Sequence, residues 1–134
     1  MVNKKNKKFN TKSKLNTQIT LIKKIYLKEN QQITFIEKFK KKIKEYDVVK
    51  KSWGYYATPS INKRLKRFKY ECAIIKNNQN KFFLCLINKD MKKKFNLYLK
   101  EDGQKIVCWL NSNNLKLIEN LNLLNNEYLY KSRD

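Results

Sequence analysis

Histidine is absent from this sequence of 134 residues, which removes the most common general base and a common metal ligand of proteins. Glycine occurs only at Gly54 and Gly103, so the chain has no glycine-rich loop of the kind that cradles phosphates. The three cysteines lack the CxxC spacing of metal and redox sites, and Glu101 and Asp102 are the only adjacent carboxylates. We therefore predict that the protein is not an enzyme and uses no metal ion, cofactor or small-molecule substrate.

Acidic residues are also scarce: 11 Asp and Glu stand against 32 Lys and Arg, which gives a formal net charge of +21. Nine lysines precede Glu29, the first acidic residue. Repulsion at this charge destabilises an isolated monomer and favours a polyanionic partner, with nucleic acid first and an anionic membrane surface second. No run of 18 apolar residues is present, so we predict no membrane-spanning segment.

Arginine supplies only three of the cations, Arg64, Arg67 and Arg133. This scarcity disfavours the bidentate reading of guanine, whereas lysines bind backbone phosphates without reading bases. Lysine, asparagine, isoleucine, phenylalanine and tyrosine have AT-rich codons, so the base composition of a genome accounts for part of the basicity. Such a bias does not deplete Asp and Glu to the same degree, and we therefore interpret the excess charge as functional.

Most of the local order lies in the segment 52–110. Four short runs in it are rich in aromatic or β-branched residues and are bounded by turn or helix signals, which predicts strands. These runs are 53–58, 70–75, 82–87 and 106–110.

Two helices are predicted between these strands. Thr58 as N-cap with Pro59 at the first helical position predicts a helix that runs to Phe68. Asp90 caps a second helix, 91–100, and Gly103 lies where a left-handed C-terminal cap belongs. The short segment 77–80 can form only a hairpin loop. The order βαββαβ predicts an α+β fold with a small ferredoxin-like core over 52–110.

Three further segments flank this core. Residues 1–17 are predicted to form a basic extended arm, and residues 111–134 a C-terminal helix and tail that begins at Asn111 or Ser112. Residues 18–48 are predicted to be helical, because apolar residues recur there at a spacing of three to four. These apolar positions are Ile19, Ile22, Tyr26, Ile33, Ile36, Phe39, Ile43 and Tyr46.

Apolar residues occupy both alternating faces of 82–87 and 106–110, so we expect both faces of the sheet to be covered. The segment 81–88 lacks the glycines and the spaced aromatics of the RNA-recognition motif. Tyr55 and Tyr56 are the only candidates for base stacking, and we expect the aromatic residues of the strands to pack in the core. The cysteines are predicted to be small core residues in a reducing compartment.

The predicted nucleic-acid-binding surface combines the N-terminal arm, the helix after Pro59 and the start of the helix 91–100. In the first of these helices Lys63, Lys66 and Arg67 share an outward face suited to phosphate contacts. The predicted binding residues are Lys4, Lys5, Lys7, Lys8, Lys12, Lys14, Lys63, Arg64, Lys66, Arg67, Lys69, Lys92, Lys93 and Lys94.

These features favour a structural RNA-binding protein of a large ribonucleoprotein. In general character, with a basic tail and a small αβ core, the chain resembles ribosomal proteins. We expect it to neutralise rRNA phosphates beside neighbouring proteins of the same particle, in a mitochondrial or other organellar ribosome, or otherwise in a bacterial cytoplasm. Two alternatives stay open. One is a small DNA-binding protein of an AT-rich bacterium, plasmid or phage, and the other is an assembly subunit whose charge is codon bias.

Overall fold

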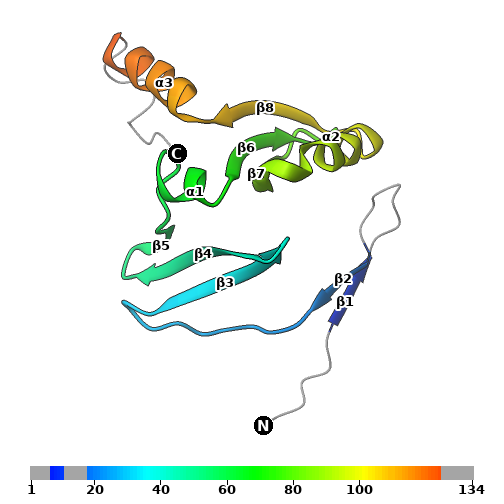
Figure 1. Cartoon of the computed structure of the whole chain (residues 1–134), viewed down its shortest axis with the longest axis vertical. Coiled ribbons are helices and arrows are strands. Elements are labelled where there is room, and N and C mark those ends of the chain that lie inside the picture. The colour runs from blue at the N-terminus through cyan, green and yellow to red at the C-terminus, as the bar shows by residue number, and fades with distance from the viewer. Residues whose placement is uncertain (1–6, 11–17, 125–134) are drawn as a thin grey trace.

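The computed structural model describes residues 7–10 and 18–124, which form a mixed α+β fold. Two three-stranded antiparallel sheets, β3–β4–β5 and β7–β6–β8, lie one above the other with α1 between them, and β1 pairs with β2 in a separate ribbon (Figure 1). The strands are β1 Lys7–Asn10, β2 Gln18–Leu21, β3 Gln32–Phe39, β4 Lys42–Lys51, β5 Gly54–Ala57, β6 Tyr70–Lys76, β7 Phe82–Asn88 and β8 Lys105–Leu110. The helices are α1 Arg64–Arg67, the 3₁₀ turn η1 Lys89–Met91, α2 Lys92–Glu101 and α3 Ser112–Leu124.

All four strands predicted in 52–110 are present as β5, β6, β7 and β8, but the ferredoxin-like order is not confirmed. The strand β5 pairs with β4 in the other sheet, and β6 lies between β7 and β8 with both pairings antiparallel. The residues before β5 explain this difference. Lys51 pairs with Gly54 across a two-residue turn, and such a local hairpin closes at a much lower entropic cost than a crossover.

The helix predicted over 18–48 is wrong. These residues contain β2, β3 and most of β4, and β3 pairs antiparallel with β4 from Gln32 opposite Val49 to Phe39 opposite Lys42. The turn between these strands has positive φ angles at both Lys40 (47°) and Lys41 (64°). Hairpin turns with two positive φ angles normally contain asparagine and glycine, so two lysines gave no turn signal in the sequence.

The helices differ from prediction at their starts. Thr58 does not cap α1, which is a single short turn after Ser60, and the Arg64 amide donates to Ser60 Oγ at 3.2 Å. The cap before η1 and α2 is Asn88 and not Asp90. The Asn88 side chain accepts a hydrogen bond from the Asp90 amide at 3.1 Å. The other end of α2 is as predicted, because Gly103 has a φ of +67° just after the helix.

The start of the C-terminal helix also agrees with prediction. The Asn111 Oδ1 atom accepts the Asn114 amide at 2.8 Å, which makes Asn111 the cap of α3. The helix is described to Leu124, and the predicted tail beyond it lies outside the described residues.

Two apolar clusters form the core, one on each face of the β7–β6–β8 sheet. Ala73, Ile75 and Ile87 pack under Leu99 of α2 on the first face. On the second face Leu65 of α1 packs with Tyr70 and Cys72 of β6. Tyr46 of β4 packs against the same cluster. The expected covering of both faces therefore holds only in part, since Phe82 and Leu84 at one end of β7 are 61% and 67% exposed.

The cysteines lie in the strands, as predicted. Cys72 is buried, Cys85 and Cys108 are half-buried, and none of the three forms a disulfide. Burial raises the pKa of Cys72 and of Cys85, so both thiols stay protonated at neutral pH.

Polar contacts between the two sheets are made by a buried lysine and a buried asparagine. Lys44 Nζ of β4 donates to Asn88 Oδ1 of β7 at 2.9 Å and lies 4.9 Å from the centre of the Tyr70 ring. The Tyr70 hydroxyl donates to Glu37 of β3, and Asn88 Nδ2 donates to the same carboxylate at 3.4 Å. Because these groups bond one another, the charge of Lys44 is tolerated at 4% exposure.

Candidate nucleic-acid interface

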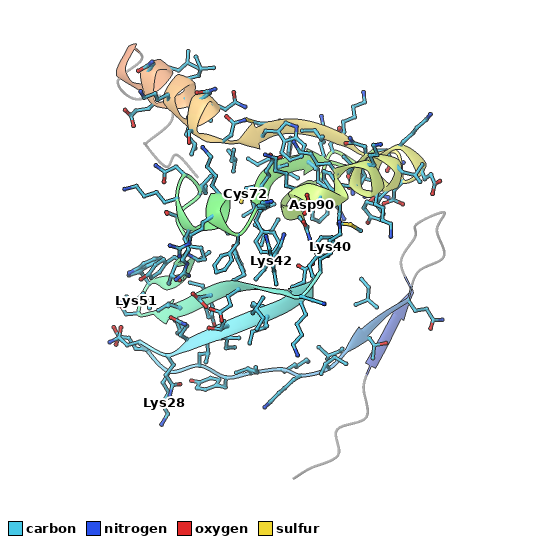
Figure 2. All side chains as sticks on the ribbon, in the orientation of Figure 1. Lys28, Lys40, Lys42, Lys51, Cys72 and Asp90 are labelled. Carbon is cyan, nitrogen blue, oxygen red and sulfur yellow. The ribbon has the colours of Figure 1, made fainter. Side chains whose placement is uncertain are left out.

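A cavity of about 500 Å³ opens between α1, the first residues of β6 and the junction of β8 with α3. The apolar part of its lining includes Ile61, Leu65 and Leu110, together with Cys72 on the side of β6 that faces α1 (Figure 2). The junction of β8 with α3 adds the polar residues Asn111, Ser112 and Asn113. Three exposed lysines also line the cavity. They are Lys66, Lys69 and Lys89.

The backbone brings two of these lysines together, although they are distant in sequence. Lys69 adopts a left-handed φ of +58° between α1 and β6, and its carbonyl oxygen accepts the Lys89 amide at 2.8 Å. This bond continues the pairing of β6 with β7, in which Tyr70 lies opposite Asn88. Lys66 lies on α1, one turn of helix before Lys69. The three ammonium groups therefore belong to a single surface around the cavity.

Negative charge is nearly absent from the cavity lining. Glu71 is the only acidic residue among the lining residues, and its carboxylate pairs with Lys92 Nζ at 2.6 Å. Burial, and then the hydrogen bond to Glu37, raises the pKa of the Tyr70 hydroxyl, so the tyrosine is neutral at physiological pH. The first turn of α3, which forms another wall, contains no acidic residue and adds the positive end of a helix dipole.

Exposed side chains of α1 extend this basic surface. Lys63 and Arg67 are exposed, and the Arg67 guanidinium lies 5.8 Å from the centre of the Phe68 ring. Of the residues predicted from the sequence in this helix, Lys63, Lys66, Arg67 and Lys69 are thus available to a partner.

Two predicted binding residues are occupied by contacts within the protein. Arg64 forms an ion pair with Asp47 of β4 and also donates to Thr58 Oγ1 at 2.9 Å. Lys92 pairs with Glu71 and lies 4.6 Å from the centre of the Trp109 ring. Both partners are distant in sequence, and the local pattern shows only a run of cations. A phosphate contact by either residue stays a prediction.

The remaining predicted residues fall into three groups. Lys93 and Lys94 are exposed on α2 and do not line the cavity. Only the backbone of Lys7 and Lys8 is described, in β1. The other arm lysines lie outside the described residues, and they are Lys4, Lys5, Lys12 and Lys14.

Sequence reasoning missed Lys89. It is an isolated lysine after β7, and nothing in its local sequence marks it as a neighbour of Lys69. The pairing of 70–75 with 82–87 across the predicted hairpin loop was the one signal that could have placed it there, because residues 69 and 89 flank the open end of that hairpin.

The charge of a lysine-rich surface of this kind is suited to contacts with anions. In residues 18–124 no cluster of three His, Cys, Asp or Glu side chains could hold a metal ion. Among the described helices none is long and apolar enough to cross a membrane. The cavity has a volume typical of small-ligand sites, which is large enough for one nucleotide unit.

Comparison with known proteins gives no relative: no protein-family model matches the chain, and no curated protein or solved structure is significantly similar to it.

Proposed function

We propose that this protein binds RNA as a structural component of a large ribonucleoprotein, with a ribosome as the first candidate particle and no catalytic role. The observation that carries the proposal is the convergence of Lys66, Lys69 and Lys89 on one cavity whose only carboxylate is already paired. Free ammonium groups around a lining of apolar and neutral polar side chains favour a ligand that is anionic at its edge. A backbone phosphate with its attached sugar and base has this character.

The mechanism is charge neutralisation with release of counterions. Each lysine that contacts a phosphate displaces a condensed cation, so binding weakens steeply as salt concentration rises. The high net charge of +21 adds long-range attraction that brings the protein to the RNA. Among the exposed cations of the described residues only Arg67 can make a bidentate contact, so this surface is suited to binding phosphates in a folded RNA instead of reading its sequence.

Neighbouring proteins of the same particle are also part of the proposal. Exposed apolar side chains such as Phe82 and Leu84 at the end of β7 are unusual on an isolated monomer. In a dense particle such residues find protein neighbours. A mitochondrial or other organellar particle would suit the composition of the chain.

The first test is a competition between nucleic acids. We would measure binding of the full chain to a folded RNA stem-loop and to DNA of the same sequence by fluorescence anisotropy, at two salt concentrations. The proposal predicts tighter binding of the RNA and a strong loss of affinity at the higher salt. Tighter DNA binding would favour the DNA-binding alternative, whereas no salt-dependent binding of either would favour an assembly subunit with compositional charge.

A second test examines the particle. An epitope-tagged chain would be expressed in cells of the organism that encodes it. The lysate of these cells would be sedimented with and without RNase. The proposal predicts that the protein sediments with a large particle and leaves it when the RNA is cut. Sedimentation in a complex that RNase does not affect would contradict it.

A further inference from the structure

Aromatic side chains gather on the surface at the turn between β4 and β5. Trp53 is 70% exposed, Tyr55 is 60% exposed and Tyr56 is 42% exposed. The sequence pattern predicted that such residues pack in the core, and the structure corrects this for all three. Leaving three neighbouring aromatic rings in water forgoes the free energy of their burial, which indicates that another molecule covers them.

The local backbone fixes how these rings are presented. Trp53 and Tyr56 stack with ring centres 5.9 Å apart and planes inclined by 24°. Gly54 lies between them with a φ of +144°, which residues with a side chain rarely adopt. A Cβ atom at Gly54 would meet nothing within 4 Å, so the glycine serves the backbone turn and not close packing. Trp53 and Tyr56 are thus held in a defined arrangement, whereas Tyr55, the strand neighbour of Tyr56, lies on the opposite face of β5.

Lysines adjoin the rings on the same end of the sheet. Lys50 Nζ lies 5.1 Å from the centre of the Tyr55 ring, and Lys51 Nζ donates to Asn30 Oδ1 at 2.7 Å. The turn that contains Lys28 is joined to β4, since the Asn30 amide donates to the Lys50 carbonyl at 2.8 Å. Figure 2 shows Lys28 and Lys51 at this end, away from Lys40. Glu29 is the one acidic residue in the turn, so the surface keeps a net positive charge.

We propose that the stacked pair Trp53 and Tyr56, with Lys28 and Lys51, forms a platform on which bases of single-stranded RNA stack while the lysines contact the adjacent phosphates. The inference rests on the proposed RNA-binding function and adds a second contact surface to it. Exposed aromatic rings beside cations are the recurring design of proteins that bind single strands without reading sequence. Charge complementarity selects this occupant, because the protein's net charge of +21 opposes a second copy of itself and favours a polyanion.

The test compares an oligouridine 12-mer with an abasic ribose-phosphate 12-mer, which has the same charge but no base to stack. Anisotropy titrations of the full chain would use the wild type, the Trp53→Ala/Tyr56→Ala variant and the Trp53→Leu/Tyr56→Leu variant. The leucine variant keeps apolar area but removes the aromatic rings. Phe82→Ala is the matched control, because Phe82 is also exposed and also has a lysine, Lys76, 5.5 Å from its ring centre.

The platform predicts that the wild type binds oligouridine at least tenfold more tightly than the abasic strand. Both double variants should lose this difference while their affinity for the abasic strand stays the same, and Phe82→Ala should behave as the wild type. Equal wild-type affinity for the two strands would overturn the platform while leaving the RNA-binding proposal in place. A leucine variant that binds oligouridine as the wild type does would also overturn it. Failure of the proposed function would look different, because neither strand would then bind.

Unfolding in urea serves as the check on folding. Trp53 is mostly exposed and Tyr56 is 42% exposed, so the double variants should keep a midpoint close to that of the wild type. If a protein partner covers the rings instead, the wild type will show no preference for bases, and this result contradicts the platform.

Discussion

The carboxylate of Asp47 on β4 forms an ion pair with the guanidinium of Arg64 on α1, and this pair joins the β3–β4–β5 sheet to the helix that leads into β6. Asp47 is buried and also accepts Thr34 Oγ1 at 2.6 Å and Thr58 Oγ1 at 3.3 Å. Arg64 therefore has a structural role, and the lysines of α1 are left to face the solvent.

Replacing Asp47 by asparagine should destabilise the fold. The change leaves the charge of Arg64 without its counter-ion and weakens two hydroxyl hydrogen bonds, so we expect the free energy of unfolding to fall by about 1–3 kcal/mol. Urea denaturation at pH 7 measures this difference. Glu119→Gln, an exposed change of the same kind on α3, is the control and should stay within about 0.5 kcal/mol of the wild type. Equal effects of the two changes would show that the ion pair contributes nothing.

Lowering the pH should remove the stabilisation that the ionised Asp47 carboxylate contributes to the fold. The hydrogen bond from Thr34, reinforced by Arg64, holds the pKa of Asp47 below its ordinary value despite the opposing effect of burial. A lowered pKa in the folded state means that the stabilisation is complete above the unfolded pKa of about 4 and is lost as the pH falls through the folded pKa. The difference in unfolding free energy between the wild type and Asp47→Asn should thus shrink from pH 6 to pH 3. A difference that stays constant over this range would contradict the assignment.

The contact between Lys44 and Asn88 should be the other sensitive link between the sheets. Asn88→Ala removes the acceptor at 2.9 Å from Lys44 Nζ and leaves a buried ammonium without that bond. We expect the free energy of unfolding to fall by about 2 kcal/mol. Asn96→Ala on the exposed surface of α2 is the matched control, and it should be neutral or slightly stabilising because alanine favours helix. If both variants unfold at the wild-type urea concentration, the sheets do not depend on this contact.

Gly103 after α2 should resist substitution for a reason of backbone conformation. A Cβ atom there would lie 3.7 Å from Asn78 Nδ2, an ordinary contact, but the φ of +67° is strained for alanine. Gly103→Ala should therefore lower the free energy of unfolding by about 1–2 kcal/mol. Gly103→Asn should cost less, because asparagine tolerates the left-handed region. Thermal unfolding of both variants measures the order, and a larger destabilisation by asparagine would point to crowding instead.

The sequence predicted those elements whose signals are local. The strands β5 to β8 were found because each is short, apolar and bounded, and Asn111, the cap of α3, was one of the two positions predicted for it. The hairpin of β3 and β4 was missed because the spacing of Ile33, Ile36 and Phe39 also fits a helix, and its turn consists of Lys40 and Lys41. The strand β5 pairs with β4, so its sheet could be predicted only together with β4. Because residues 18–48 were predicted to be helical, no strand was expected there for β5 to pair with.

The candidate site also combines residues that could be predicted from the local sequence with residues that only the fold brings together. The cluster from Lys63 to Lys69 was visible as a dense run of cations, and four of its five charged residues are exposed. The intramolecular partners of Arg64 and Lys92 could not be predicted, because Asp47 and Glu71 reach them only through tertiary contacts. Lys89 lies at the cavity because β7, which it follows, pairs with β6. Charge density can thus be predicted from composition, whereas the pairing of each charge is decided by the fold.

The most direct measurement is the salt dependence of RNA binding by a cavity variant. We would compare the wild type, Lys66→Gln/Lys69→Gln/Lys89→Gln, and a control in which three exposed lysines elsewhere are neutralised. The control is Lys100→Gln/Lys105→Gln/Lys116→Gln.

We predict that the slope of log affinity against log salt for single-stranded RNA becomes shallower by about 2 in the cavity variant, close to 0.7 for each phosphate that is no longer neutralised. The control should change the slope by less than half as much. Equal changes in the two variants would contradict the proposed site, because RNA would then respond only to total charge and not to the cavity between α1 and β6.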